Sequence, residues 1–394
     1  MVKRIGTIAC MFFCLMPSAF AIKSGQPAVK VSDSVCTCTG IIQRGSCGKN
    51  VRYTLDSNGI LTISGVGNMA NYAYPIAPAP WKDYESRINK IIIEDGVTSI
   101  GDYAFTRHSG LTSIGPKGSG ASVEIPKSVI WIGRWAFADC KSLSSVTIPE
   151  SVTSIGDFAF AFCTSLTSVT IPESVTSIGN SAFASCVSLT NVTIPEKVDS
   201  IGSQAFSGCS SLTSVTIPES VTSIEDGVFA CCYSLTSITI PKSVTSIGEC
   251  AFVDCKNLTS VTIPHGVTLI DERVFAHCSR LISVTIPESV TSIRACAFEF
   301  CDSLTSVTIP ESVTSIGNSA FADCVSLTNV TIPESVTLVE HRAFAECNSL
   351  NEVEYCGLTN PKCGSYVFGG CDELAAVKTP KDYRDSVFCG KPVK

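Results

Sequence analysis

Four histidines, His108, His265, His277 and His341, are the side chains best suited to acid–base chemistry near neutral pH. They occupy four different places within a repeated sequence, so stacking of the repeats cannot gather them into one cluster with a carboxylate. Serine is abundant, but the chain contains neither a Gly-x-Ser-x-Gly nucleophile motif nor a phosphate-binding glycine loop. The pattern predicts solvated histidines, no enzyme active site and no cofactor.

Cysteine recurs every 23 residues, and this ladder offers thiol or metal chemistry. Its members are Cys140, Cys163, Cys186, Cys209, Cys232, Cys255, Cys278, Cys301, Cys324 and Cys347, with Cys371 after them. Neighbouring members of a stack have parallel Cβ vectors about 5 Å apart, whereas a disulfide needs Cβ atoms nearer ~3.8 Å that face one another. One ligand per repeat also fails to enclose a tetrahedral metal ion. We expect buried thiols, with disulfides between repeats as the alternative.

Six cysteines lie outside the ladder near the two ends of the repeats, where the apolar core is thinnest: Cys36, Cys38, Cys47, Cys356, Cys363 and Cys389. Cys36-Thr37-Cys38 lacks the two-residue spacer of a redox or zinc motif. In an exported chain these residues predict structural disulfides, whose pairing the sequence leaves open.

The 23-residue period governs the fold. Prolines run from Pro126 to Pro333, and phenylalanines from Phe137 to Phe344, at this spacing without exception, through ten contiguous units. A variant unit with an inserted loop precedes them at 94–125, and a degraded unit follows. These two ends have the character of caps, which a solenoid needs because a terminal unit has only one neighbour.

Each unit predicts two extended pieces. Val169 and Ile171 alternate with polar residues as in a strand with one buried face, and Val175 with Ile178 marks a short strand after the turn at Pro172. Ile178, Ala182, Phe183 and Cys186 then recur at helical offsets, which favours a helical turn. We therefore expect an α/β solenoid of about twelve stacked units, each a strand, a turn, a short strand and a short helical turn.

The repeated word Ile-Pro-x-x-Val-x-x-Ile-Gly-x-x-Ala-Phe-x-x-Cys-x-x-Leu resembles that of the BspA-type leucine-rich-repeat surface proteins, and the likeness covers residues 94–379. Upstream, Cys47 to Val51, Leu55 to Gly65, Gly67 and Pro80-Trp81 are similar to the cap segment often found before such repeats. The resemblance implies an extracellular or cell-surface location and adhesion to host or microbial partners. It does not identify the ligand, because a shared scaffold carries different ligands.

The two termini bear on location. Residues 1–21 read as a secretory signal peptide, with Lys3 and Arg4 before an apolar run and Ala19-Phe20-Ala21 as cleavage site. We assign 22–93 to an N-terminal cap, 94–379 to the solenoid and 380–394 to a C-terminal tail that carries no anchoring apolar stretch. No segment after the signal has the ~20 consecutive apolar residues of a membrane-spanning helix. A secreted or surface-attached monomer is expected.

The formal net charge is −7, and it becomes −9 without Lys3 and Arg4. This sign disfavours nucleic acid as a partner. A column of glutamates after proline, from Glu150 to Glu334, favours counter-ions or a basic partner, but such columns are more often solvated turn surface.

Two surfaces are candidates for binding. The strands present a regular Ser-x-Thr ladder from Ser145 to Thr331, which would suit an ordered polysaccharide or ice lattice, or serve only as a soluble face. The opposite edge varies from unit to unit and carries residue types common at interfaces: Trp135, Phe158, Phe162, Tyr233, Arg273, Arg294, Phe300 and His341. We expect a protein or glycan ligand on the variable edge, with packing between neighbouring units as the alternative role for each residue.

Overall fold

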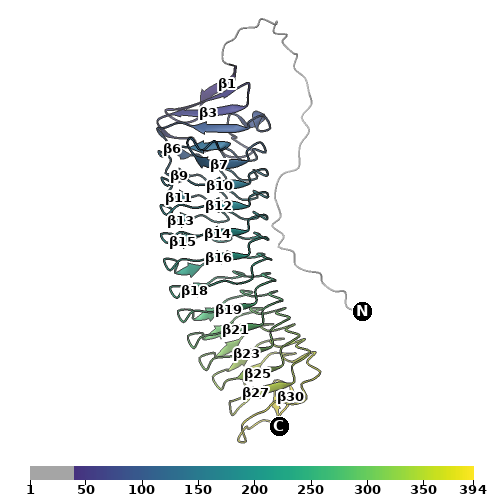
Figure 1. Cartoon of the computed structure of the whole chain (residues 1–394). Coiled ribbons are helices and arrows are strands. Elements are labelled where there is room, and N and C mark those ends of the chain that lie inside the picture. Colours follow the sequence, from purple (N-terminus) through teal and green to yellow (C-terminus); the bar gives the residue numbers. More distant parts are fainter. Residues whose placement is uncertain (1–39) are drawn as a thin grey trace, which may run out of the picture. The chain divides into compact units, whose positions relative to one another are not determined.

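The computed structural model describes residues 40–394, and the structure of the predicted signal peptide, Cys36 and Cys38 lies outside this range. Residues 41–394 form one unit. It is a solenoid in which successive rungs lie one above another, as Figure 1 shows from β6 to β27. Each rung presents a strand on one face, a shorter strand on a second face and turns on the third.

The first face is a mainly parallel sheet that begins in the N-terminal cap. Its strands lie in the order β1 (Ile41–Ser46), β2 (Val51–Asp56), β3 (Ile60–Gly65), β5 (Lys90–Ile93), β8 (Val123–Ile125), β7 (Ser113–Pro116), β10 (Ser145–Thr147), β12 (Ser168–Thr170), β14 (Asn191–Thr193) and β16 (Ser214–Thr216). The first three are antiparallel, and pairing is parallel from β3 onward. The antiparallel strands of the cap therefore form the N-terminal end of the sheet.

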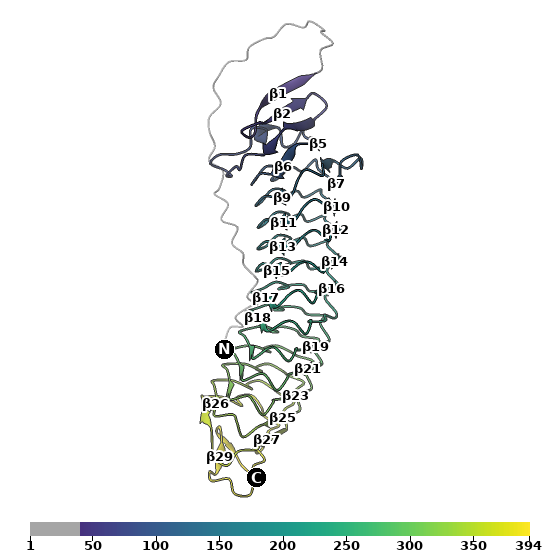
Figure 2. The ribbon, with the colours of Figure 1, turned by 90° about the vertical axis from the view of Figure 1, so that its left-hand side faces the viewer.

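The same face continues in two shorter sheets. These are formed by β19 (Ser260–Thr262) with β21 (Ser283–Thr285), and by β23 (Ser306–Thr308), β25 (Asn329–Ile332) and β27 (Glu352–Tyr355). Between β16 and β19, a single bridge from Thr216 to Thr239 takes the place of a strand. Figure 2 shows a nearly straight column from β10 to β16 and a change of direction in the rungs after it.

The second face consists of two-residue strands in register. They are β4 (Gly67–Asn68), the longer β6 (Val97–Ile100), β9 (Trp131–Ile132), β11 (Ser154–Ile155), β13 (Ser177–Ile178), β15 (Ser200–Ile201), β17 (Ser223–Ile224), β18 (Ser246–Ile247), β20 (Leu269–Ile270), β22 (Ser292–Ile293), β24 (Ser315–Ile316), β26 (Leu338–Val339) and β28 (Lys362–Cys363). They form three sheets, β4 to β15, β17 with β18, and β20 to β28, and within the regular units each residue pairs with the residue one unit away, as Ser154 does with Ser177. The 23-residue period of the sequence thus sets the register in which neighbouring strands pair.

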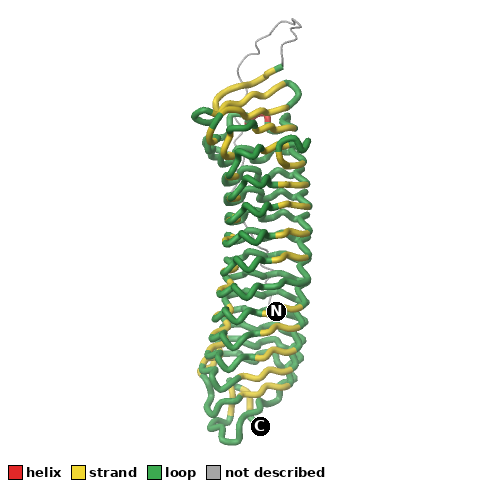
Figure 3. The backbone as a smooth tube through the Cα atoms, turned by 60° about the vertical axis from the view of Figure 1, so that its left-hand side comes forward, coloured by secondary structure: helices red, strands yellow, loops and turns green. Residues whose placement is uncertain are grey.

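The third face differs from our expectation, because turns replace the helical turn in every unit. Within residues 40–394 the only helix is the 3-10 helix η1 (Lys82–Tyr84) in the cap, and Figure 3 shows loop along the third face. The backbone N–H groups here bond to the next rung, as Phe160 does to the carbonyl of Ala182 at 2.8 Å. An α-helix would use those groups within the unit.

The core consists of stacked columns of identical side chains. The phenylalanines that follow alanine in each unit or take the equivalent place, from Phe105 to Phe344, form one buried column, and consecutive rings of this column lie 5.2–5.9 Å apart between centroids. The aromatic column begins at Trp81, whose indole N–H donates to Ala104, and continues at the other end through Phe368 to Phe388. The two caps therefore cover the same column that the repeats build.

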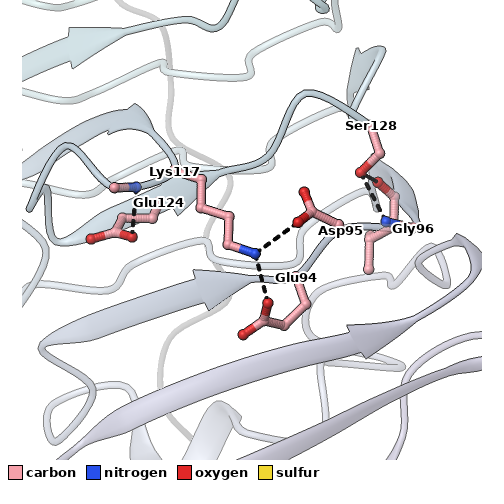
Figure 4. A network of polar contacts seen from close by, with 8 residues as sticks. Glu94, Asp95, Gly96, Lys117, Glu124 and Ser128 are labelled. Carbon is pink, nitrogen blue, oxygen red and sulfur yellow. Dashed lines mark hydrogen bonds and ion pairs between the residues drawn. The ribbon is translucent and has the colours of Figure 1, made fainter.

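The loop inserted in the variant unit is tied down by charge. It joins β7 to β8, and the Lys117 ammonium contacts Glu94 at 2.8 Å and Asp95 at 3.0 Å, as Figure 4 shows. Glu124 at the end of the loop accepts hydrogen bonds from Lys90 and from the backbone N–H of Gly118. Hydrogen bonding to the ionised form lowers the pKa of the Glu124 carboxyl. The insertion thus adds one strand to the sheet without opening the stack.

The C-terminal tail folds back on the last rung. Here β29 (Val387–Phe388) and β30 (Lys391–Pro392) form an antiparallel hairpin, and Val393 bridges to Val377. A disulfide joins Cys363 to Cys389 across the same region. Residues 380–394 are therefore part of the C-terminal cap.

Candidate functional site

Two positions on the third face have left-handed backbone in every unit. The first left-handed column comprises Tyr103, Trp135, Phe158, Ser181, Gln204, Gly227, Cys250, Arg273, Cys296, Ser319, Arg342 and Tyr366. The second comprises Arg107, Asp139, Phe162, Ser185, Gly208, Cys231, Asp254, His277, Phe300, Asp323, Glu346 and Gly370. Their φ values lie between 53° and 76°. These columns contain five of the eight residues that the sequence predicted for binding.

Left-handed backbone suits glycine, asparagine and aspartate, and it costs other L-residues about 1–2 kcal/mol. Several units meet this demand with Gly208, Gly227 or Asp254. Trp135, Phe158, Phe162 and Phe300 have large side chains at the same positions. Because the fold does not require aromatic rings there, these residues conflict with local preference, and such conflicts concentrate at functional sites.

Four of these aromatic side chains gather on neighbouring rungs into what we term the aromatic stack: Tyr103, Trp135, Phe158 and Phe162. The Trp135 ring lies 4.2 Å from Phe158 and 5.8 Å from Tyr103, with interplanar angles of 7° in both pairs. Phe162 lies 6.4 Å from Trp135. All four side chains are half-buried, so the rings cover one another and still present apolar surface to solvent. Ser181 ends the stack on the next rung.

Charged and phenolic side chains lie where the N-terminal cap meets the aromatic stack. Arg107 donates to the Tyr74 hydroxyl at 2.8 Å and pairs with Asp139 at 3.3 Å, while the Lys82 ammonium lies 4.6 Å from the Tyr74 ring centre. Burial raises the pKa of the Glu85 carboxyl in the same region, against the opposing charges of Arg107 and Lys82. The stack is thus bordered by fixed polar groups on its N-terminal side.

His108 occupies the place of the ladder cysteine in the variant unit and is 1% exposed. Its Nδ1 lies 3.1 Å from the Thr106 carbonyl, and its Nε2 has no partner among the described residues. Burial lowers the pKa of the imidazole to about 4, so the ring is neutral at pH 7. A cavity of about 10 Å³ beside it has room for about one water molecule. The prediction of solvated histidines is wrong for His108.

The remaining predicted residues lie apart from the stack. Tyr233, Arg273 and Phe300 lie on the turn edge, whereas Arg294 and His341 follow the short strands of the second face. Tyr233 receives the Lys256 ammonium 4.9 Å from its ring centre, and Arg294 pairs with Asp271 at 3.4 Å. Phe300 stacks on His277 at 4.7 Å, and His341 lies 2.8 Å from the Ser365 hydroxyl. Arg273 is exposed. The structure therefore concentrates the predicted surface at its N-terminal rungs, and elsewhere leaves single residues or pairs.

The other candidate surfaces are regular and exposed. Serine, threonine and asparagine of the first face point outward on both sides of a buried valine, as in β12 and β14. The glutamates after proline are also exposed. Among residues 40–394 no three histidine, cysteine, aspartate or glutamate side chains are placed to hold a metal ion, and no helix there is long and apolar enough to cross a membrane.

The repeated rungs match the sequence profile of the BspA-type leucine-rich-repeat region, at 83–183, 117–229, 176–302 and 268–391. These matches together span well over half of the chain. The chain belongs to the BspA-type leucine-rich-repeat family. Its members are scaffolds built from repeats, in keeping with the stack of rungs described above.

Solved structures of bacterial leucine-rich-repeat proteins share the fold. One from Eubacterium ventriosum is 25% identical, with a TM-score of 0.55, over 83% of this chain and 94% of that one. One from Bacteroides ovatus is 26% identical, with a TM-score of 0.52, over 88% and 98%. No curated protein sequence matches the chain. The family thus defines the scaffold, and the ligand must be argued from the surface.

Cysteines of this family member serve packing more than cross-linking. Ladder thiols donate to the carbonyl of the phenylalanine one rung back, as Cys209 does to Phe183 at 3.3 Å. Burial raises the pKa of Cys209 to about 12. The C-terminal pair Cys363–Cys389 is a disulfide, whereas Cys47 and Cys356 are thiols within residues 40–394; the other predicted disulfide cysteines, Cys36 and Cys38, lie outside this range. Cys47 lies in the apolar core of the cap. A disulfide at this residue would require a second cysteine whose Cα lies within about 7 Å of its own.

Two aromatic residues near the site were not among those predicted. Tyr103 extends the stack into the variant unit, and Trp131 lies on the second face, where the same position in seven later units is serine. Comparison of each position across the units gives the signal for Trp131, an aromatic residue in a column that is mostly serine, and for Tyr103, which shares its column with Trp135 and Phe158. The inserted loop obscures the alignment of the variant unit.

Proposed function

We propose that the chain is an exported adhesion module, secreted or held at the cell surface, that binds a protein partner through its variable turn edge. The aromatic stack is the principal contact. This assignment rests on one observation: three bulky aromatic side chains, Trp135, Phe158 and Phe162, occupy left-handed positions on two consecutive rungs, whereas most other units fill these positions with small, polar or charged residues.

The energetics favour recognition at the stack. Partly exposed tryptophan and tyrosine rings supply large apolar contact area with few rotatable bonds, and such residues carry much of the binding energy at protein interfaces. The stacked rings also hold one another in place before a partner arrives, which reduces the entropy lost on binding. Separate residues such as Tyr233 and Phe300 add weaker contacts along the same edge, and several contacts on one scaffold strengthen binding together.

Binding rather than catalysis is the role that the side chains support. His108 is buried, His277 is stacked on Phe300, and His341 contacts Ser365, so these three imidazoles lie in separate environments. The negative formal charge disfavours a nucleic-acid partner. The lattice alternative has less support, because the regular strand pairing beneath the Ser-x-Thr ladder is reduced to a single bridge at Thr239 and lattice matching needs a continuous array.

The test uses substitutions that the same column already contains. Trp135→Gln and Phe158→Ser introduce residues found in this column at Gln204 and Ser181, so both variants should keep the fold. Arg273→Ser is the matched control in the same column, away from the stack. The purified chain without residues 1–21 is first bound to an array of immobilised extracellular-matrix proteins. Each variant is then titrated against the protein bound most tightly.

We expect Trp135→Gln to weaken binding about 30-fold, from the ~2 kcal/mol typical of an interface hot spot, with Arg273→Ser near the parent. Deleting the unit 172–194 preserves the stack and should change the affinity little. Binding that survives both stack substitutions, but declines as units are removed, would locate recognition on the hydroxyl ladder. Failure to saturate on any protein of the array would count against the proposal.

A further inference from the structure

A shallow groove of about 360 Å³ runs along the second face, separate from the turn edge. It crosses β9, β11, β13 and β15, and its lining includes Trp131, Arg134, Ser154, Asp157, Ser177 and Asn180. A ligand in this groove would lie along the stack of rungs, perpendicular to the strands.

An unbroken run of glycines accompanies the groove on these rungs. Gly133, Gly156, Gly179 and Gly202 occupy the position after the short strand in four successive units. A Cβ at Gly156 would lie 2.8 Å from the carbonyl carbon of Gly133, so the rungs approach too closely for a side chain. In the next unit the position is Glu225, and later units carry Asp271, Arg294 and Glu340, with single glycines at Gly248 and Gly317 between them. Beyond the groove, side chains thus interrupt the run of glycines on the same strip.

The polar groups of the groove are held in place. Asp157 accepts from the backbone N–H of Asn180 at 2.9 Å and pairs with the Arg134 guanidinium at 3.5 Å. Asn180 in turn accepts from the N–H of Ser203 at 2.9 Å, and Ser177 donates to Ser154 at 3.1 Å. One guanidinium and one carboxylate cancel in formal charge. The wall of the groove therefore has no net charge and offers hydroxyl, amide and carboxylate groups to a ligand.

Trp131 provides an aromatic surface at the N-terminal end of this wall. The equivalent position is serine in seven later units and leucine at Leu269 and Leu338. The tryptophan is half-buried, so part of the indole is accessible. An aromatic face beside fixed hydroxyl and carboxylate groups matches a sugar ring, which has an apolar C–H face and a rim of hydroxyls.

We propose that this groove binds an uncharged glycan chain that runs along the rungs, with Trp131 stacked on one sugar ring. The rungs rise by about 4.8 Å, the spacing of neighbouring strands, which is close to the length of one pyranose in an extended chain. Successive sugars can therefore meet equivalent serines on successive rungs. A peptide fits less well, because the backbone groups of β11 and β13 already pair with the neighbouring rungs and leave no strand edge to extend.

The test again uses residues that the column tolerates. Trp131→Ser removes the aromatic platform, and Ser177→Leu places in the groove the side chain found at Leu269 and Leu338. Outside the groove, Ser315→Leu makes the second exchange in the same column, and Leu338→Ser replaces a large apolar side chain of that column with serine. Cello-, xylo-, manno- and chitohexaose, with a trigalacturonate as the charged comparison, are titrated by calorimetry into the chain without residues 1–21. Thermal unfolding of each variant verifies that it is folded.

We expect at least one neutral hexasaccharide to saturate the protein, Trp131→Ser and Ser177→Leu to weaken it at least 10-fold, and both control variants to bind as the parent does. The Trp135→Gln variant should retain glycan binding, so this proposal and the proposed function can fail separately. No binding by any neutral hexasaccharide, equal binding by all variants, or binding of the trigalacturonate alone would overturn the proposal.

Discussion

Truncation of one phenylalanine in the middle of the core column tests the assignment of inside and outside. Phe206 is fully buried, and its ring stacks on Phe183 at 5.5 Å and on Phe229 at 5.9 Å. Phe206→Ala removes both ring contacts and leaves a cavity, which should cost about 3–5 kcal/mol. The two aromatic pairs account for about 1–3 kcal/mol of that loss. Glu219→Ala in the exposed turn is the control and should cost less than about 0.5 kcal/mol.

The location of the damage is as informative as its size. In a solenoid each rung contacts only its neighbours, so the cost should be shared between the rungs of Phe183 and Phe229 and decline toward both ends. Repeat arrays can unfold in parts, and a single unfolding midpoint would average over these parts. Native-state hydrogen exchange in low urea resolves them, because amides such as Phe183 N–H, bonded to Ala205 at 2.8 Å, report on one junction.

Two results would refute this reasoning. Equal loss of stability in Phe206→Ala and Glu219→Ala would mean that the buried and exposed columns are exchanged. Uniform loss of protection from the N-terminal cap to the last rung would mean that the stack behaves as one cooperative unit rather than as coupled neighbours.

Three further predictions concern titratable and sulfur groups. Ladder thiols such as Cys209, whose pKa burial raises, should resist a thiol reagent at pH 8 in the native protein and react once it is unfolded; rapid native labelling would contradict their burial. Reducing Cys363–Cys389, 26 residues apart, should destabilise the C-terminal cap by about 3 kcal/mol and speed limited proteolysis of residues 352–394, with Cys363→Ser unaffected by reductant. The lowered pKa of His108 means that protons bind the unfolded chain preferentially between about pH 6.5 and 4, so stability should fall as the pH drops through this window. His108→Cys introduces the residue that other units have in this column and should reduce the loss of stability on acidification. Urea unfolding at pH 7 and pH 4.5 measures this loss, and an unchanged pH dependence would exclude His108 as its cause.

The periodic sequence was enough to identify the buried columns. A side chain that recurs every 23 residues occupies the same site on every rung, so the uniform columns of Phe137, Cys140 and Leu143 had to be either all inside or all outside. Their apolar character decided for the inside, and all three are fully buried. Strand positions followed in the same way from the alternation of valine with serine and threonine.

The third segment of the unit could not be read from local pattern. Ile178, Ala182, Phe183 and Cys186 have helical spacing, yet the chain there forms turns, because the backbone bonds to rungs 23 residues away instead of to its own unit. Local propensity does not include partners so distant along the chain. These turns produce the left-handed columns. The aromatic residues at the variable edge are notable because they lie in these columns.

The sequence by itself therefore determined the period, the core, the candidate edge and the family resemblance, since each depends on residue type at a repeated position. Only the tertiary structure decided that Trp135, Phe158 and Phe162 join Tyr103 in one stack, that Gly156 and its equivalents open a groove beside Trp131, and that Cys363 pairs with Cys389. The physical reason is that these features depend on how far one rung is displaced from the next. Hydrogen bonds and packing between rungs set that displacement.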